Sequence, residues 1–360
     1  MRGLVFLAAA HTIMVAMKLE QVARRARVST ATVSRVLNDK ARVREVTRAR
    51  VLKAIEELNY HPNLHARSLA GGQSRSLGVI VSNIENPFFL DIYKTVEVGA
   101  HEAGYDVILA NTDYKSDRLV TSIRLMLGRR VAGLAAIVSE MDAALIQELS
   151  SQRIPVVFYD VGAPRKNITN IRVDYRRGME KLTAYLYNLG HRRIGYLGHH
   201  LSLGPIHERV QAVRDVASRY ADLEVETATG ADTLEGGRRA ARALLERHPG
   251  LTALVCVNDV MAVGALRELR AQGRKVPEDI SVTGFDDVTL AQFCSPALTS
   301  VHIPREQIGR TICDCLLPRD QAVTERDFVI DPELVLREST APPPDPGPAR
   351  SRTDRGRRRR

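Results

Sequence analysis

The 360-residue sequence predicts an all-α head followed by a two-lobed α/β body built from doubly wound parallel sheets. Residues 17–75 contain three short helical patterns separated by tight turns, and residues 76–340 alternate short apolar runs with amphipathic stretches. Charge is segregated in the same way. Residues 17–75 carry 13 Lys or Arg against 5 Asp or Glu, whereas residues 77–340 carry 31 against 35.

The head begins with two short helices close together. The first is predicted from apolar residues at helical intervals, which are Leu19, Val22, Ala23 and Ala26. The connector 27–29 breaks this pattern, and a second helix follows over 30–37. Two helices this short and this close indicate a helix-turn-helix. Either Ser29 or Thr30 can cap the second helix, which leaves the side chains of its first turn free to enter a DNA major groove.

A third helix completes the predicted core of the head. Asn38-Asp39-Lys40 has the composition of a loop, and Thr47 is predicted to open the helix, whose Val51, Ile55 and Leu58 close the core. The basic residues around this small core are typical of a surface that binds DNA phosphates. The alternative to DNA binding is that these basic residues form only a solvated face of an ordinary helical domain.

The segment 28–38, VSTATVSRVLN, together with TRARVLKAIEELNYHPNLHARSLAGG, resembles the head of the lactose-repressor and galactose-repressor family of bacterial transcription regulators. The resemblance continues through SLGVIVSNIENPFF, LGHRRIGYLG, VNDVMAVGAL, ISVTGFDD and LTSVHIP, and so covers residues 17–338. It implies a DNA-binding domain over 17–61, a hinge helix and linker over 62–75, and a periplasmic-binding-protein-like effector-binding and dimerisation domain over 76–340. The lobes are expected over 76–173 with 305–322, and over 174–304 with 323–340.

The resemblance also implies which head residues contact DNA. Thr30, Ala31 and Arg35 occupy the base-reading positions. Arginine can donate to both guanine acceptors, and a small side chain can contact a thymine methyl group, so Arg35 is the strongest candidate for a base contact. The remaining contacts are expected at phosphates, or as helix caps, from Ser29, Thr32, Ser34 and Asn38.

The segment after Pro62 is helix-compatible but short, and it ends in Gly71-Gly72. Because it has little apolar surface, we expect it to be disordered without DNA. The resemblance implies a hinge helix that orders on the operator, with Leu69 wedged into the minor groove and Arg67 and Ser68 at the backbone nearby. The alternative to a minor-groove contact is that Leu69 packs on the body of the protein.

The body contains seven short apolar runs that predict strands: Leu77–Val81, Tyr105–Ala110, Leu134–Val138, Pro155–Phe158, Ile194–Leu197, Leu251–Val257 and Ile280–Thr283. This length exceeds one ordinary core, so two lobes joined by crossovers are predicted. Ligands of such folds bind outside the carboxyl ends of the strands, where loops of both lobes converge.

Polar and aromatic residues stand at these corners between strands and helices. Their carboxylate, amide and guanidinium groups suit a sugar-like or nucleobase-like ligand, and aromatic faces pack on apolar ring surfaces. The resemblance implies effector contacts for Phe88, Phe89, Asp160, Arg209, Asn258 and Asp286. Phe89 is equally compatible with the core, and Asp259 is better interpreted as the cap of the following helix. Val210 and Ile303 depart from the family pattern, so no named inducer is transferred to this chain.

The sequence contains no catalytic signature: GxSxG, a phosphate-binding loop, HExxH and a Gly-rich fingerprint at the first strand are all absent. We therefore expect no enzyme, no cofactor and no metal. His199, His200 and His207 lack metal-ligand spacing and are expected as exposed loop residues. His191 is expected at a helix end, where the dipole favours its charge. The four cysteines form no CxxC pair and are expected to be reduced.

The two ends fall outside the resemblance. Residues 1–16 resemble a poor signal peptide and are interpreted as a doubtful extension before a working start at Met17. Residues 341–360, rich in Arg and Pro, are predicted to be a disordered basic tail. The sequence predicts a cytoplasmic homodimer that represses transcription from a palindromic operator under control of a small effector. An exported sugar-binding protein and a ligand-insensitive DNA-binding protein are the alternatives.

Overall fold

The computed structural model describes residues 19–37, 43–60, 74–141, 143–160, 167–201, 204–317 and 327–344. The chain divides into two compact units, Met1–Ser74 and Arg75–Arg360, which correspond to the predicted head and body. Among the described residues, no helix combines the length and the apolar character that a membrane crossing needs.

The head contains three helices, over residues 19–26, α2 (Thr30–Leu37) and α3 (Glu45–Glu57). Arg27 has a positive φ of 52°, which turns the chain sharply between the first two helices. Two predicted details of the third helix were wrong. The helix begins at Glu45, two residues before Thr47, and Leu58 is 42% exposed. Tyr60 closes the core instead, packed with Val22, Ala23, Ala26, Val33, Val36, Val51 and Ala54.

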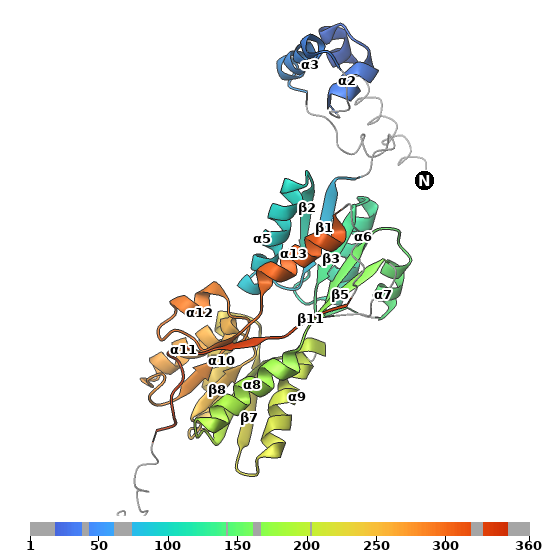
Figure 1. The fold of residues 1–360 in the computed structure, drawn as a ribbon. Helices are drawn as coiled ribbons and strands as arrows, with labels where there is room; N and C mark the ends of the chain where they lie inside the picture. The colour runs from blue at the N-terminus through green and yellow to red at the C-terminus, as the bar shows by residue number, and fades with distance from the viewer. Residues whose placement is uncertain are drawn as a thin grey trace, which may run out of the picture. The chain divides into compact units, whose positions relative to one another are not determined.

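The first lobe of the body is built on a six-stranded parallel sheet with strand order β11-β5-β4-β3-β1-β2. Its strands are β1 (Ser76–Val81), β2 (Asp106–Asn111), β3 (Gly133–Ile137), β4 (Val156–Tyr159), β5 (Ile168–Val173) and β11 (Asp327–Ile330). Its helices are α5 (Pro87–Glu102), α6 (Ser116–Gly128), α7 (Ala143–Ser150) and α13 (Arg305–Leu316). Although α13 comes late in the chain, it packs beside α5 (Figure 1).

Both faces of this sheet are covered, which explains why its strands are continuous apolar runs. In β1, Leu77 and Val79 belong to the core under α5 and α13, whereas Ile80 points to the opposite core under α6 and α7. Side chains alternate between the two faces with period 2, so one strand contributes to both cores. This arrangement directs every β-to-α loop of the lobe to the carboxyl end of the sheet.

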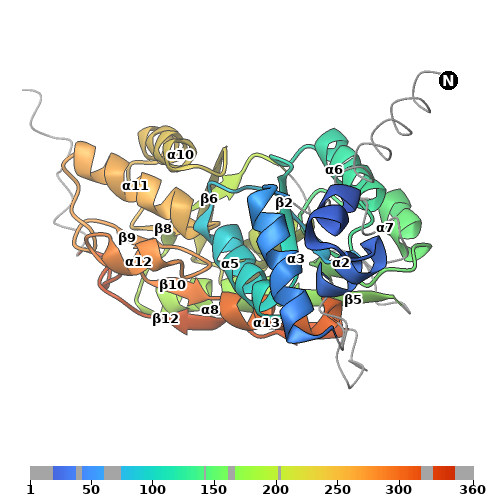
Figure 2. The same cartoon turned by 90° about the horizontal axis from the view of Figure 1, so that it is seen from above.

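The second lobe is built on a four-stranded parallel sheet with strand order β7-β6-β8-β9. Its strands are β6 (Arg193–His199), β7 (Glu224–Gly230), β8 (Ala253–Cys256) and β9 (Ser281–Thr283). Its helices are α8 (Tyr175–Asn188), α9 (Gly204–Arg219), α10 (Leu234–Arg247), α11 (Asp259–Ala271) and α12 (Thr289–Phe293). A small antiparallel pair, β10 (Ser300–His302) and β12 (Glu333–Val335), completes it. Helices α10 and α11 lie side by side in the view from above (Figure 2).

The connections between the lobes differ from the prediction in one respect. Residues 323–340 were expected in the second lobe, but β11 pairs in parallel with β5 of the first sheet, and only β12 belongs to the second lobe. Arg172 and Asp327 reinforce this pairing with an ion pair of 2.8 Å. The chain therefore crosses between the lobes after β5, before α13 and again after β11.

The end of the described chain also differs from the prediction. Residues 341–344 were predicted to be disordered, but Ala341 O accepts hydrogen bonds from Ser281 Oγ at 3.0 Å and from the His191 ring at 2.9 Å. The His191 ring is completely buried and also contacts Thr252 Oγ1, and this burial lowers its pKa. His191 follows the end of α8, as predicted, and its N donates to Leu186 O at 3.1 Å, but its lowered pKa opposes the charge that the helix dipole was expected to favour. Residues 345–360 lie outside the described chain.

Candidate functional site

The residues predicted to read DNA bases lie on α2. Ser29 caps the helix, since its Oγ accepts from Thr32 N at 3.2 Å and contacts Thr32 Oγ1 at 2.9 Å. Val33 and Val36 hold the opposite side of the helix in the core. Because Ser29 supplies the cap, Thr30 is not needed for that purpose.

The three predicted base-reading residues, Thr30, Ala31 and Arg35, are all exposed. Ala31 and Arg35 are four residues apart and therefore lie on the same side of the helix. Ser34 is half-buried and has a polar interaction within the chain. The predicted contacts Asn38, Arg67 and Leu69 lie outside the described residues.

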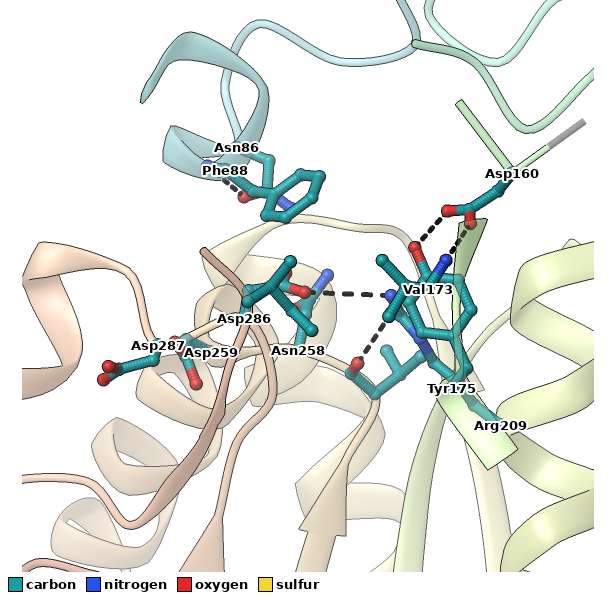
Figure 3. Close-up of polar contacts among 12 residues, drawn as sticks. Asn86, Phe88, Asp160, Val173, Tyr175, Arg209, Asn258, Asp259, Asp286 and Asp287 are labelled. Atoms are coloured by element: carbon teal, nitrogen blue, oxygen red, sulfur yellow. Dashed lines mark hydrogen bonds and ion pairs between the residues drawn. The ribbon is translucent and has the colours of Figure 1, made fainter. Parts of the chain in front are cut away.

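All six predicted effector residues line one cavity of about 50 Å³ at the carboxyl ends of the strands, between the two lobes of the body. Phe88, Phe89 and Asp160 come from the first lobe, and Arg209, Asn258 and Asp286 from the second. All of them except Phe89 are labelled in Figure 3. The remaining lining residues are Asn86, Tyr114, Val138, Ser139, Tyr159, Tyr175, His199, Pro205, Ile206, Asp232 and Val257.

Asp160 stands at the corner after β4, with a positive φ of 60° that turns its side chain back towards Tyr175. One carboxylate oxygen accepts from Val173 N at 2.8 Å, and the other accepts a short hydrogen bond from Tyr175 Oη. Burial raises the pKa of Asp160 to about 7, although both hydrogen bonds favour the ionised form. Asp160 thus fixes the tyrosine at the edge of the cavity.

Arg209 enters the cavity from α9 and is held between two aromatic rings. Its Cζ lies 4.2 Å from the centroid of the Tyr175 ring and 4.7 Å from that of Phe285. Its Nη1 donates to Val257 O at 2.9 Å, and its Nη2 is 3.7 Å from Asp286 Oδ1. Within the described chain, the buried Nε of Arg209 has no hydrogen-bond partner.

Asp286 follows β9 with a positive φ of 99° and is almost completely buried. Burial raises its pKa to about 7, with Arg209 opposing the shift. Its Oδ1 accepts no hydrogen bond from any described residue. Asp286 Oδ1 therefore forms an ion pair with Arg209 Nη2 (Figure 3), but neither Oδ1 nor Arg209 Nε has a hydrogen-bond partner among the described residues.

Two asparagines of the cavity are helix caps. Asn86 Oδ1 accepts from Phe88 N at 3.0 Å at the start of α5, and Asn258 Oδ1 accepts from Met261 N at 2.9 Å at the start of α11. The prediction that Asp259 caps α11 was therefore wrong. The buried Asp259 carboxylate instead accepts from Ser300 Oγ at 2.6 Å and Val288 N at 2.8 Å.

The aromatic side of the cavity is formed by α5 and β4. Phe88 and Phe89 pack edge to face, with their ring centroids 5.4 Å apart, and Phe88 also contacts Tyr159. Phe89 is 7% exposed and belongs to the hydrophobic core as well as to the cavity lining, so the core interpretation is confirmed and the effector contact stays a prediction.

His199 was predicted to be an exposed loop residue, and this prediction was wrong. It ends β6, is 7% exposed, and its ring stacks on His200 with a centroid distance of 4.5 Å. Burial lowers the pKa of His199 to about 4, so the ring is neutral in the cavity wall. His200 and His207 are exposed, as predicted. No group of three potential metal ligands occurs among the residues that the structure covers.

Sequence reasoning missed several lining residues, notably Tyr114, Tyr175, His199 and Asp232. Tyr114 and His199 stand at the carboxyl ends of predicted strands, so the strand-end rule would have found them if applied throughout. Asp232 follows β7, whose sequence EVETATG contains no apolar run and was not predicted as a strand. Because β7 was not predicted, nothing in the nearby sequence marked Asp232 as a residue at the end of a strand.

Comparisons with known proteins agree with this architecture. The model of the bacterial regulatory proteins of the lacI family matches residues 18–63, and that of the periplasmic binding protein-like domain matches residues 183–340. The chain is 35% identical over 327 residues to the transcriptional repressor CytR of Escherichia coli K12, covering 89% of this chain and 96% of CytR. It is 33% identical over 327 residues to the repressor PurR of Photobacterium profundum, covering 89% of this chain and 98% of PurR.

Solved structures extend the similarity to three dimensions. A lacI-family transcriptional regulator from Silicibacter pomeroyi has a TM-score of 0.80 at 28% identity and covers 90% of this chain and 99% of that one. The lac repressor dimer bound to operator has a TM-score of 0.76 at 29% identity and covers 89% and 98%. The predicted fold class is thereby confirmed. With a helix-turn-helix head and a two-lobed body matched over nearly their whole length, the chain belongs to the lacI family of bacterial regulatory proteins and is a DNA-binding transcriptional regulator.

Proposed function

We propose that this regulator represses transcription by binding a palindromic operator as a homodimer, and that a small uncharged, sugar-like effector in the cleft sets its operator affinity. The lac repressor was solved as a dimer on its operator, and the regulator CelR, 31% identical to this chain, was solved with cellobiose. A twofold dimer presents two α2 helices to the two halves of a palindrome.

The observation that carries the effector proposal is a pair of buried polar atoms, belonging to two cavity-lining residues, that have no hydrogen-bond partner among the described residues. A hydroxyl group is both a donor and an acceptor, so one ligand hydroxyl can accept from Arg209 Nε and donate to Asp286 Oδ1. The rings of Phe88 and Phe89 supply the apolar face that a sugar or nucleoside ring packs against. A ligand bound between these groups contacts both lobes.

The charges of the cavity favour an uncharged ligand. Its described lining contains the carboxyl groups of Asp160, Asp232 and Asp286 but only one guanidinium, that of Arg209. This guanidinium already donates to Val257 O, and the His199 ring is neutral. An anionic ligand would give up its hydration among three carboxyl groups, which costs free energy. We infer that the cleft binds its ligand without converting it.

The proposed coupling requires that the ligand bind one arrangement of the lobes better than another. A ligand held by both lobes meets this requirement, since a change in the pose of one lobe changes its contacts. The regulator acts on DNA and is therefore proposed to work in the cytoplasm, with the hinge segment 62–75 transmitting the change to the head.

The DNA-binding part is tested by selecting preferred duplexes from a random pool at fixed salt concentration. The wild-type chain is expected to enrich a palindrome. Arg35→Ala should relax one position in each half-site and weaken binding by about 1–3 kcal/mol per contact. Arg239→Ala, at an exposed position of α10 in the second lobe, is the matched control and should select the same palindrome. Enrichment of no sequence by the wild type would refute operator recognition.

The effector part is tested by measuring operator affinity with neutral pentoses, hexoses and nucleosides beside their phosphates. At least one neutral compound should change the affinity, and its phosphate should be less effective. Asp286→Ala should abolish the response while the enriched palindrome is still bound. A response to phosphates alone would overturn the proposed ligand class, and no response to any neutral compound would count against it.

A further inference from the structure

Asp232 joins the two lobes across the cleft. It stands between β7 and α10 in the second lobe and is 4% exposed. From the first lobe, Tyr114 Oη donates to its Oδ2 at 2.7 Å, and the amide nitrogens of Asn83 and Asn86 donate to the same oxygen at 3.3 Å each. Asn83 also donates to the backbone carbonyl of Asp232 at 3.1 Å. From the second lobe, Asn258 Nδ2 donates to Oδ1 at 2.5 Å.

The orientation of the donors is set by other contacts. Asn86 and Asn258 each use Oδ1 to cap a helix, so each amide group must turn its NH₂ towards Asp232. Asn83 Oδ1 likewise accepts from Glu85 N at 2.9 Å. Burial and the nearby Asp232 hold the pKa of Tyr114 well above its ordinary value, so this hydroxyl remains a donor.

Three helix N-termini offset the free-energy cost of burying the Asp232 carboxylate. Asp232 directly precedes Thr233, which caps α10 by accepting from Gly236 N at 3.0 Å. The cap residues of α5 and α11 donate to it directly, so three helix N-termini surround one negative charge. The positive end of a helix dipole favours an anion at this position. The site is therefore suited to a carboxylate, and Asp232 supplies it.

We propose that Asp232 is an internal latch that holds the two lobes closed in the absence of any ligand. Three donors of the first lobe converge on one residue of the second, and every one of these contacts is lost when the lobes separate. Charge-assisted hydrogen bonds in a site shielded from water are stronger than neutral ones. The latch lies in the cleft assigned above to the effector, but its action requires neither effector nor operator.

The latch implies that the effector does not close an open cleft. A ligand that reaches the cavity must enter while Asp232 is released, and it is then enclosed when the latch re-forms. In this proposal, the closed arrangement of the lobes depends on the hydrogen bonds that Asn83, Asn86 and Tyr114 donate to Asp232.

The test compares the ligand-free, full-length wild type with Asp232→Asn and Asp222→Asn. Asp222 also accepts from a tyrosine, Tyr187, and from Arg192, but all three residues lie in the second lobe. Asp222→Asn therefore removes the same charge without touching an interlobe contact. The readouts are the radius of gyration from small-angle X-ray scattering and backbone hydrogen exchange over residues 83–89 and 112–115.

Asp232→Asn should enlarge the radius of gyration and accelerate exchange in these segments roughly tenfold or more, as expected for loss of charged hydrogen bonds. Asp222→Asn should resemble the wild type in both readouts. Equal behaviour of wild type and Asp232→Asn, or an equal change in both variants, would overturn the latch. If Asp232→Asn does not fold, Tyr114→Phe decides the question, because it removes one interlobe donor and keeps the carboxylate. Neither readout depends on operator binding or effector response, so either outcome leaves the proposed function to its own tests.

Discussion

The guanidinium of Arg209 lies over the ring of Tyr175, with Cζ 4.2 Å from the ring centroid, and the hydroxyl of the same tyrosine donates to Asp160. The tyrosine thus links a carboxylate after β4 to a cation on α9. A buried guanidinium costs less free energy when it stacks on aromatic faces and lies close to an acid. This relationship places Arg209 in the cavity with its Nε unused by any described residue.

Removal of Arg209 should destabilise the body strongly. Arg209→Ala leaves Asp286 buried without its nearest cation, and we expect the free energy of unfolding to fall by about 3 kcal/mol. The measurement is urea denaturation at pH 7. Arg214→Ala, at an exposed position of the same helix, is the control and should change stability by less than about 0.5 kcal/mol. Equal effects of the two substitutions would show that the guanidinium is not buried in this way.

The raised pKa of Asp160 predicts a dependence of stability on pH. The pKa is about 7 in the folded chain, against 3.8 for the ordinary group, because the carboxyl is buried. Between these values the folded chain binds more protons than the unfolded chain. The contribution of Asp160 to stability therefore falls as pH rises from about 4 to about 7, and it is constant above that range.

Asp160→Asn should reduce this dependence. We expect the difference between the free energies of unfolding at pH 5 and pH 8 to be smaller by about 2 kcal/mol than in the wild type. The dependence is not abolished, since Asp286 has a similarly raised pKa. Asp117→Asn, at an exposed position of α6, should leave the difference unchanged. A difference as large in Asp160→Asn as in the wild type would contradict the assigned pKa.

The close packing of α10 and α11 predicts a strongly destabilising glycine substitution. A Cβ at Gly264 would collide with the carbonyl oxygen of Leu234, and this backbone atom cannot move without separating the helices. We expect Gly264→Ala to lower the free energy of unfolding by about 3 kcal/mol. Gly128→Ala is the control, because nothing lies within 4 Å of the added Cβ at the end of α6. It should be neutral or stabilise by about 1 kcal/mol, and an equal loss in both variants would refute the close approach.

The helices of the head and seven strands of the body could be predicted from the sequence, because their signals are local. Val22, Val33 and Val51 follow helical spacing, and β1 and β8 are apolar runs buried on both faces. The strands that were missed carry polar residues. In β5, Thr169 and Asn170 are buried among apolar neighbours, and β7 is an edge strand with only one buried residue. Residue type within a short window does not distinguish such strands from loops.

The sequence by itself determined the family, the helix-turn-helix and six residues that line one cavity, since each of these is marked by its neighbours in the chain. Only the tertiary structure decided which residues meet across long separations. Asp232 meets Tyr114 over 118 positions, and His191 meets Ala341 over 150. Such contacts depend on how separate elements pack, and a polar residue is buried only where packing brings it a partner. For this reason the latch and the anchored end of the body became visible only in the fold.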